Sequence, residues 1–248
     1  MTLARNLVES IGRAIFPHVC EFCARELATP AQSYICDNCR AKPHAITPIQ
    51  APFCKVCGLE YGGQITTEFV CWNCSDLEVR FESARAAVHY KALVKEVVHR
   101  YKYNRQEWFE PFLAQLLIEA ALPELKHLRI DLITPIPLHP AKLRQRGFNQ
   151  AARLAQRLSM ASGIRHEPFL LERVKATDSQ AMLDRDDRLA NVKGAFAFKP
   201  RERLAGQTIL LIDDVLTTGV TASACAKELR RHGAGPVHVW TVARGGLT

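Results

Sequence analysis

Residues 208–221 decide the fold, and they read Thr-Ile-Leu-Leu-Ile-Asp-Asp-Val-Leu-Thr-Thr-Gly-Val-Thr. An apolar run ends in two adjacent carboxylates, Asp213 and Asp214, and a loop of small hydroxyl residues around Gly219 follows. A helix-like segment then covers 221–232. An apolar run beside turn and helix signals indicates a buried strand that enters a helix.

The chemistry of this stretch favours a ligand site. Two ionised carboxylates at the end of a buried strand are costly unless a ligand or solvent reaches them. The loop offers backbone N–H groups, a flexible glycine and hydroxyls at a helix N-terminus, which suits a phosphate dianion. Carboxylates accept hydrogen bonds from sugar hydroxyls. The pattern therefore predicts a sugar-phosphate site, with a strand-to-helix turn capped by Asp or Thr as the alternative.

The stretch resembles the signature of type I phosphoribosyltransferases, which bind phosphoribosyl pyrophosphate (PRPP) with two acids and a Thr-Gly-x-Thr loop. The resemblance implies that Asp213 and Asp214 hold the ribose 2′- and 3′-hydroxyls. It also implies a 5′-phosphate loop made of Thr217, Thr218, Gly219, Val220 and Thr221. Mg²⁺ would enter with PRPP, held mainly by pyrophosphate and ribose oxygens and by water.

Length and composition indicate two unequal units. The 248 residues suffice for one substantial α/β core and a smaller module. A hydrophobic content of 48% with 23% charged residues is typical of a soluble globular protein. No apolar run is long enough to cross a bilayer. Residues 1–16 have helical apolar spacing without the apolar core of a signal peptide, so we expect a packing helix and a cytoplasmic protein.

Eight of the nine cysteines fall in four C-x-x-C pairs near the N-terminus. The pairs are Cys20 and Cys23, Cys36 and Cys39, Cys54 and Cys57, and Cys71 and Cys74. Two such pairs complete a tetrahedral S₄ zinc site, so the sequence predicts two Zn²⁺ ions. A disulfide framework fits poorly, because the chain shows no export signal. A redox C-x-x-C motif would need a thioredoxin-like context.

The near-even spacing of the pairs permits either sequential or interleaved pairing. We favour sequential pairing, because each half of the module then closes on itself as a zinc ribbon. The module, with the N-terminal helix, covers 1–78, and the second domain covers 79–248. Cys225 lies apart on an apolar helical stripe and is interpreted as a buried structural thiol.

Residues 134–151 read Thr-Pro-Ile-Pro-Leu-His-Pro-Ala-Lys-Leu-Arg-Gln-Arg-Gly-Phe-Asn-Gln-Ala, which is similar to the hallmark of the ComF competence family. A second family-like string comprises Gln180, Leu183, Arg188, Asn191 and Gly194-Ala195-Phe196. Residues 180–191 also resemble the mobile hood of type I enzymes, from which Arg188 could reach a phosphate. The alternative is an ordinary charged helix. A cysteine module followed by a PRPP-type domain is the order of that family.

The ComF resemblance implies a role in natural transformation and DNA uptake. Internalised single-stranded DNA would be handled on the cytoplasmic side, together with DNA-uptake or helicase and processing proteins. Such partners could hold the protein peripherally at the inner membrane. The sequence leaves the oligomeric state open.

Three cations follow the strand predicted over 129–136, where ligands bind in open α/β sheets. Lys142, Arg144 and Arg146 are candidates for the pyrophosphate or for a nucleic-acid backbone, since arginine can donate two parallel hydrogen bonds to phosphate. Arg188 is a further candidate. The alternative is a solvated basic helix face.

Residues 99–105 interleave cations with aromatic rings, and the net charge of +8 favours polyanions. Rings of this kind can stack on unpaired bases while cations follow the phosphates. The candidates for single-stranded DNA are Arg100, Tyr101, Lys102, Tyr103 and Arg105. The alternative is an amphipathic helix whose tyrosines line the core.

Strands that alternate with helices predict an α/β fold, a mostly parallel twisted sheet with flanking helices. The resemblance makes it type I phosphoribosyltransferase-like. Strands are expected over 84–90, 129–136, 168–174, 194–198, 208–213 and 236–243. Helices are expected over 91–103, 107–122, 149–161 and 221–232.

Turnover is a separate question from PRPP binding. Purine-salvage members of the superfamily carry an Asp in the phosphate loop, and Thr217 occupies that position here. The sequence assigns no catalytic residue. We therefore expect a PRPP-binding ComF-like protein that handles single-stranded DNA. The alternative is an active phosphoribosyltransferase of nucleotide salvage or related metabolism that acts on a base or amine.

Overall fold

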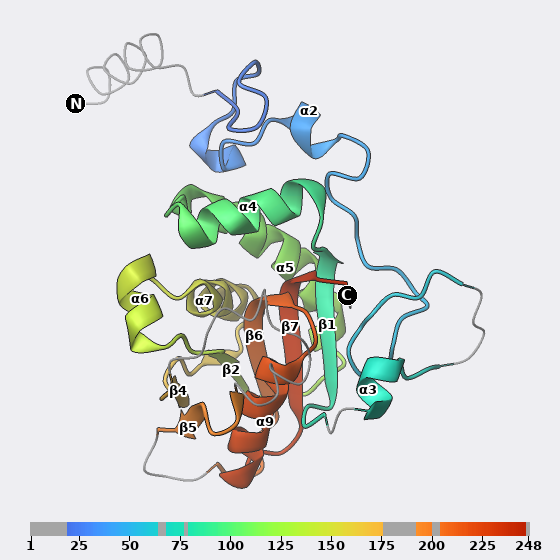
Figure 1. Ribbon diagram of the computed structural model, residues 1–248, viewed down its shortest axis with the longest axis vertical. Coiled ribbons are helices and arrows are strands. Elements are labelled where there is room, and N and C mark those ends of the chain that lie inside the picture. The colour runs from blue at the N-terminus through green and yellow to red at the C-terminus, as the bar shows by residue number, and fades with distance from the viewer. Residues whose placement is uncertain (1–18, 64–67, 77–78, 176–191, 200–203, 247–248) are drawn as a thin grey trace.

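The structure, a computed structural model, describes residues 19–63, 68–76, 79–175, 192–199 and 204–246 (Figure 1). The helix predicted over 1–16 lies outside the described residues. So does the hood segment predicted over 180–191, including Arg188.

A five-stranded sheet forms the centre of the structure, in the order β1-β7-β6-β2-β3. All of its strand pairings are parallel. The strands are Ser83–His89 (β1), Leu132–Pro135 (β2), Arg165–His166 (β3), Ile209–Leu216 (β6) and Val237–Arg244 (β7). The predicted α/β class with a mostly parallel sheet is confirmed.

Helices cover both faces of this sheet (Figure 1). They are Ala92–Tyr103 (α4), Glu107–Phe109 (η2), Glu110–Leu125 (α5), Gln150–Ser162 (α7) and Val220–Arg231 (α9). Leu210 and Ile212 of β6 pack in the cluster that contains α4, α5 and α7. Ile209 and Leu211 pack in the cluster that contains α9, because successive side chains of a strand point to opposite faces. No described helix has the length and apolar character needed to span a membrane.

β6 is longer than the strand predicted over 208–213. It continues through both aspartates, and Val215 and Leu216 still pair with β7. The two carboxylates therefore lie near the carboxyl end of the strand and not beyond it. Asp213 and Asp214, as neighbours in a strand, point to opposite faces of the sheet.

The strands predicted over 168–174 and 194–198 do not join the parallel sheet. Leu171–Arg173 (β4) and Phe196–Phe198 (β5) pair with each other, antiparallel, as a separate two-stranded sheet. The expectation fails at this point because side-chain alternation reveals a strand but does not identify its partner.

A short helix follows β2; it is not among the helices that the sequence predicts, although the alternative for its cations is a basic helix face. It covers Pro140–Arg146 (α6) and carries the three candidate cations. His139 caps it, because its Nδ1 accepts the N–H of Ala141 at 3.2 Å. Pro140 suits the first turn, where a backbone N–H has no helical acceptor. Gly147 ends the helix at φ +90°, a conformation that favours glycine.

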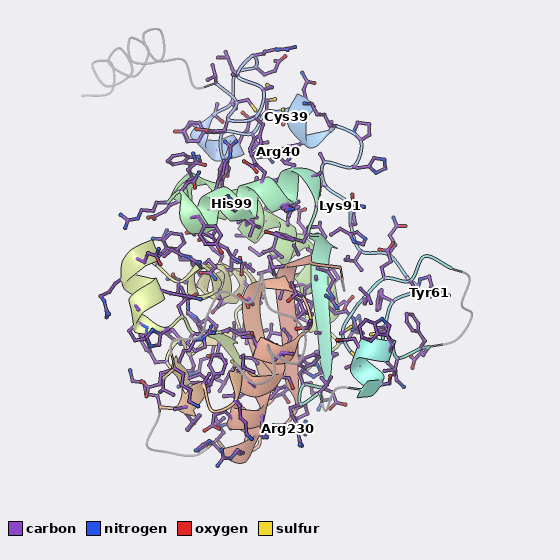
Figure 2. The ribbon with its side chains drawn as sticks, viewed as in Figure 1. Cys39, Arg40, Tyr61, Lys91, His99 and Arg230 are labelled. Atoms are coloured by element: carbon purple, nitrogen blue, oxygen red, sulfur yellow. The ribbon has the colours of Figure 1, made fainter. Side chains whose placement is uncertain are left out.

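The first zinc ribbon, residues 20–40, lies against α4 (Figure 1) and contacts η2. It includes Pro30–Gln32 (η1) and Asp37–Arg40 (α2). The ring centroid of Phe22 lies 5.8 Å from that of Phe109. Arg40 places its guanidinium 5.0 Å from the ring centroid of Phe112 and lies between the cysteines and the helices (Figure 2). Aromatic contacts thus fix this ribbon on the helical layer.

The second zinc ribbon, the described part of residues 54–76, lies beside β1 and includes Trp72–Asp76 (α3) (Figure 1). The N–H of Ala84 donates to the carbonyl of Val56 at 2.6 Å. Gly58 has φ +65°, and a Cβ at that position would lie 2.7 Å from the carbonyl oxygen of Ala84. Only glycine allows the ribbon to approach the strand this closely.

Candidate functional site

A cleft of about 170 Å³ opens at the carboxyl ends of β2 and β6. These neighbouring strands mark the point where the strand order reverses, since β3 lies on one side and β7 on the other. Ligands of open α/β sheets bind at such a point. We name it the central cleft, and its polar lining comprises Lys102, Lys142, Arg146, Gln150, Arg173, Asp213, Asp214, Thr217, Thr218 and Thr221, with Gly219 and Val220 beside them.

Residues 217–221, which the sequence predicts to hold a 5′-phosphate and which we name the phosphate loop, follow β6 and include the first two residues of α9. Gly219 caps α9 at φ +84°. The first turn of a helix leaves backbone N–H groups without helical acceptors, and these attract anions. Thr218 Oγ1 is buried and has no hydrogen-bond partner among the described residues. A buried hydroxyl without a partner is destabilising, so it fits a ligand that brings an oxygen acceptor.

Asp214 is held by a cation from a distant helix. Its Oδ2 lies 2.5 Å from Nζ of Lys102, which is on α4. Only 3% of the Asp214 side chain and 18% of the Lys102 side chain are exposed. Asp213 Oδ1 accepts the N–H of Asp214 at 2.9 Å. The carboxylates are therefore fixed in place before any ligand arrives.

Burial and neighbouring charges shift the pKa values of Asp213, Asp214 and Lys102 in different ways. Burial raises the pKa of Asp213 well above its usual value, and the neighbouring Asp214 adds to this. Burial acts in the same direction on Asp214, but Lys102 outweighs it and lowers the pKa of Asp214. Burial would lower the pKa of Lys102, yet the two carboxylates raise it. At neutral pH the Lys102–Asp214 pair is ionised, whereas Asp213 retains its proton to an unusually high pH.

Arg173 is a cleft residue that the sequence reasoning missed. It belongs to β4, is 9% exposed, and lies with its guanidinium 5.4 Å from the ring centroid of Phe196. Burial lowers its pKa. The available signal was its place two residues after Leu171, on the inward side of a predicted strand. Gln150 is a second missed residue, and its Oε1 accepts a hydrogen bond from Arg146.

The segment proposed for single-stranded DNA is divided by the structure. Tyr101 is fully buried, with its ring centroid 4.9 Å from that of Phe148, so the prediction that it stacks on bases is wrong. Helical periodicity places it on the face of Val97 and the rest of the apolar stripe. Arg100 binds the first ribbon, since its Nη1 donates to the carbonyl of Glu21 at 3.2 Å.

The remaining members of that segment meet α6 at a second cleft of about 220 Å³. We name it the basic cleft, and it is lined by Lys102, Tyr103, Arg105, Lys142, Gln145 and Arg146. Arg105 Nη2 donates to the carbonyl of Gln145 at 2.9 Å, which joins the end of α4 to α6. The Arg146 guanidinium lies 5.4 Å from the ring centroid of Tyr103.

Both clefts share Lys102, Lys142 and Arg146. Two basic segments that are far apart in the sequence therefore meet beside the aspartates. None of the residues that line the basic cleft is acidic. Arg144 is exposed on α6 and is not among the residues that line either cleft.

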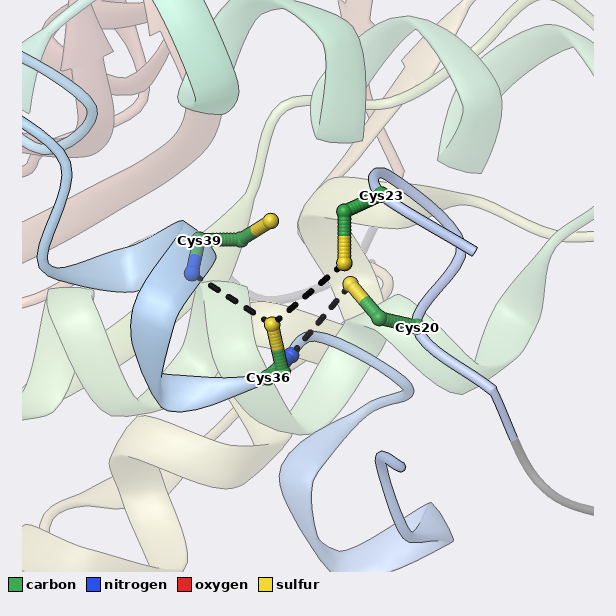
Figure 3. Close-up of side chains that lie close together, drawn as sticks. All are labelled: Cys20, Cys23, Cys36 and Cys39. Atoms are coloured by element: carbon green, nitrogen blue, oxygen red, sulfur yellow. Dashed lines mark hydrogen bonds between the residues drawn. The ribbon is translucent and has the colours of Figure 1, made fainter. Parts of the chain in front are cut away.

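The cysteines form two groups, Cys20, Cys23, Cys36 and Cys39, and Cys54, Cys57, Cys71 and Cys74. Within each group the ligand atoms lie within 4.8 Å of one another. The sulfur atoms of Cys23 and Cys36 are 3.8 Å apart (Figure 3). Those of Cys57 and Cys71 are 3.6 Å apart. Four sulfurs about 2.3 Å from one Zn²⁺ at tetrahedral corners lie about 3.8 Å apart. The thiols therefore fit two zinc ions.

Backbone N–H groups complete the geometry of the zinc sites. In the first group, the N–H of Cys39 donates to Cys36 Sγ and the N–H of Cys36 donates to Cys20 Sγ, both at 3.4 Å (Figure 3). In the second, the N–H of Cys71 donates to Cys54 Sγ at 3.3 Å. Such bonds stabilise thiolates. The preferred sequential pairing is confirmed, and Cys225 is buried apart from both groups.

Comparison with known proteins agrees with two zinc ribbons in the N-terminal part of the chain. Residues 11–75 match the family model of the double zinc ribbon domain. Solved structures give a weak likeness: adenine phosphoribosyltransferase from Saccharomyces cerevisiae is 18% identical, with a TM-score of 0.35, over 54% of this chain and 69% of that chain.

Relatives align over nearly the full length. Competence protein F from Haemophilus influenzae is 31% identical over 220 residues, which cover 86% of this chain and 92% of the relative. DNA utilization protein YhgH from Salmonella typhi is 29% identical over 92% of this chain and 97% of its own. Competence protein ComFC from Bacillus subtilis is 28% identical over 85% and 84%. The chain therefore belongs to the ComF competence protein family.

Proposed function

We propose that the protein binds PRPP with Mg²⁺ in the central cleft and handles internalised single-stranded DNA during DNA uptake and use. The observation that carries the proposal is that one cleft joins an aspartate pair to a threonine-lined phosphate loop at a helix N-terminus. This combination complements a phosphorylated sugar.

Each part of PRPP has a complementary group in this assignment. Asp213 and Asp214 accept hydrogen bonds from the ribose 2′- and 3′-hydroxyls. The Thr218 hydroxyl, which has no partner among the described residues, and the N-terminus of α9 receive the 5′-phosphate. Lys142, Arg146 and the buried Arg173 offer positive charge to the pyrophosphate. Mg²⁺ would be held by the ligand's oxygens and by water.

The basic cleft supports the assignment of single-stranded DNA. Tyr103 is 60% exposed and stands among cations, the arrangement in which a ring stacks on a base while phosphates are neutralised. The names of the relatives, competence protein and DNA utilization protein, point to the same class of ligand. Because three cations line both clefts, PRPP and DNA would compete for them.

Calorimetry with PRPP and Mg²⁺ tests the first half of the proposal. Asp213→Asn together with Asp214→Asn should weaken binding at least tenfold, while the content of two zinc ions per chain stays unchanged. Unchanged affinity would refute the sugar assignment. DNA binding is tested separately, by titrating a fluorescent oligonucleotide at several salt concentrations.

A second candidate function is phosphoribosyl transfer to a base or amine. It is favoured by the cations that surround the expected pyrophosphate position, since fixed positive charge stabilises a departing anion in the transition state. Incubation with PRPP and candidate acceptors, followed by measurement of released pyrophosphate, separates an enzyme from a binding protein. Release that depends on one acceptor would establish the enzyme.

A further inference from the structure

The second zinc ribbon touches the phosphate loop through Arg244, a residue that no motif marks. Arg244 ends β7 and is 2% exposed. On the ribbon side, its Nε donates to the carbonyl of Cys57 at 3.2 Å and its Nη2 donates to Cys57 Sγ at 3.4 Å. On the loop side, Nη1 donates to the carbonyl of Leu216 at 3.0 Å and also to that of Thr217. One side chain therefore joins a zinc ligand to the start of the loop.

Asn73 makes a second connection. It lies between Cys71 and Cys74 on α3 and is 1% exposed. Its Nδ2 donates to the carbonyl of Thr218 at 3.1 Å. Three consecutive carbonyls, from Leu216 to Thr218, are thus held by side chains that are fixed to the second ribbon.

The first ribbon carries the same short motif without this contact. Residues 36–39 read Cys-Asp-Asn-Cys and residues 71–74 read Cys-Trp-Asn-Cys. Asn38 is exposed to solvent, whereas its counterpart Asn73 is buried against the loop. The first ribbon instead accepts hydrogen bonds from α4 and α5: Arg100 donates to the carbonyl of Glu21, and the N–H of Phe112 donates to the hydroxyl of Ser33. The side-chain contacts to the loop described above come from the second ribbon.

Electrostatics links the metal to this contact. Among the described residues no carboxylate lies within ion-pair distance of Arg244, and its partners are carbonyls and a cysteine sulfur. Four thiolates outweigh the charge of one Zn²⁺, so a loaded site is a negative group beside the guanidinium. Zinc also holds the ribbon backbone that carries Cys57 and Asn73, so its removal would release the groups that fix Arg244 and the loop.

We propose that Arg244 and Asn73 are positioning residues that make the order of the phosphate loop depend on zinc in the second ribbon. The first ribbon's zinc has no such effect. The consequence for ligand affinity rests on the proposed function, whereas the order of the loop does not. Zinc loading of one ribbon thereby sets how well the chain holds a sugar phosphate.

The experiment compares Asn73→Ala with the matched variant Asn38→Ala. Amide hydrogen exchange of residues 216–221 should become about fivefold faster in Asn73→Ala, the factor expected for the loss of one hydrogen bond, and stay unchanged in Asn38→Ala. PRPP affinity, measured by calorimetry, should fall by a similar factor in the first variant alone. Zinc content should remain two ions per chain in both. Exchange at the wild-type rate in Asn73→Ala would overturn the proposal.

A second pair of variants tests the metal itself. Cys74→Ser and Cys39→Ser remove a ligand from equivalent positions of the two ribbons. We expect faster exchange of residues 216–221 only in Cys74→Ser, and equal rates in both would contradict the proposal. If Cys74→Ser does not fold, the comparison of Asn73→Ala with Asn38→Ala decides the proposal. Faster exchange in Asn73→Ala with no PRPP binding by any protein would retain the coupling and refute the proposed function.

Discussion

Lys102 Nζ lies 2.5 Å from Asp214 Oδ2 at the carboxyl end of the central strand, and both side chains are largely buried. The ion pair connects the helical layer that carries α4 to the strand that carries the aspartates. It is also the place where the central cleft and the basic cleft meet.

Lys102→Met should destabilise the fold by about 3 kcal/mol near neutral pH, because it leaves a buried carboxylate unpaired. The lowered pKa of Asp214 means that its contribution is present above the usual aspartate range and is lost as pH falls through the lowered value. The raised pKa of Lys102 means that its contribution is lost only as pH rises through that raised value.

The difference between wild type and Lys102→Met should therefore be largest between about pH 5 and pH 9 and shrink on both sides. Urea unfolding across this range measures it. Lys95→Met, an exposed change on the same helix, is the control and should have little effect. A difference that does not vary with pH would show that the ion pair is not its source.

Thr218→Val should separate stability from binding. The hydroxyl has no partner among the described residues, so its removal should leave stability unchanged or raise it by about 1 kcal/mol. Affinity for PRPP should fall about tenfold, because the ligand loses a hydrogen bond that only the complex makes. Thermal unfolding and calorimetry provide the two measurements.

The control for Thr218→Val is Thr134→Val. Thr134 Oγ1 is likewise buried without a described partner, but Thr134 does not line the central cleft. Thr134→Val should change stability as Thr218→Val does and should keep the wild-type affinity for PRPP. Equal losses of affinity in both variants would argue against a phosphate contact at Thr218.

Variants in the basic cleft should distinguish the two ligands. Tyr103→Ala should weaken binding of single-stranded DNA about tenfold, within the range of one lost base stack, and leave PRPP affinity unchanged. Arg146→Ala should weaken both and reduce the salt dependence of DNA binding. Anisotropy titrations, with and without PRPP, also report whether PRPP displaces the DNA.

Arg144→Ala removes the same charge from the same helix outside both clefts. The sequence predicts a role for Arg144 in DNA binding, and the comparison with Arg146→Ala measures how much of that role needs the cleft. Tyr61→Ala, an exposed ring on the second ribbon, is the control for Tyr103→Ala. If Tyr61→Ala weakened DNA binding as much as Tyr103→Ala, the basic cleft would not be the DNA site.

Gly58→Ala should detach the second ribbon from β1. The new methyl would lie 2.7 Å from a backbone carbonyl, in addition to the strain of φ +65°. We expect a loss of about 3 kcal/mol, from backbone strain together with overpacking. Gly147→Ala has a similar positive φ but no atom within 4 Å of the added Cβ, so it should cost only about 1 kcal/mol. If chemical unfolding gave the same loss of unfolding free energy for Gly58→Ala and Gly147→Ala, the close approach of Gly58 to β1 would be unimportant.

The sequence predicts the central strand and its loop well, because the information is local. The apolar run of β6, the two aspartates and Gly219 are neighbours in the sequence. The apolar run predicts the strand, and Gly219 predicts the turn before α9. The four cysteine pairs likewise predict the zinc sites. Their pairing is a property of three-dimensional proximity, and only the structure distinguishes sequential from interleaved ligands.

The parts that the sequence does not predict are contacts between distant segments. Lys102 reaches Asp214 across more than a hundred residues, and its place beside aromatic rings suggests a nucleic-acid surface instead. Arg173 enters the cleft because β4 pairs with β5, and alternation does not specify that partner. Tyr101 and Tyr103 look equivalent in the sequence, but helical rotation buries one and exposes the other.

The two aspartates occupy successive positions of one strand, so their side chains belong to different layers of the protein. A single small molecule bound by both aspartates would connect the α4 side of the sheet to the α9 side. Its arrival would then stiffen the molecule as a whole, and heat resistance would report occupancy even when no chemistry follows.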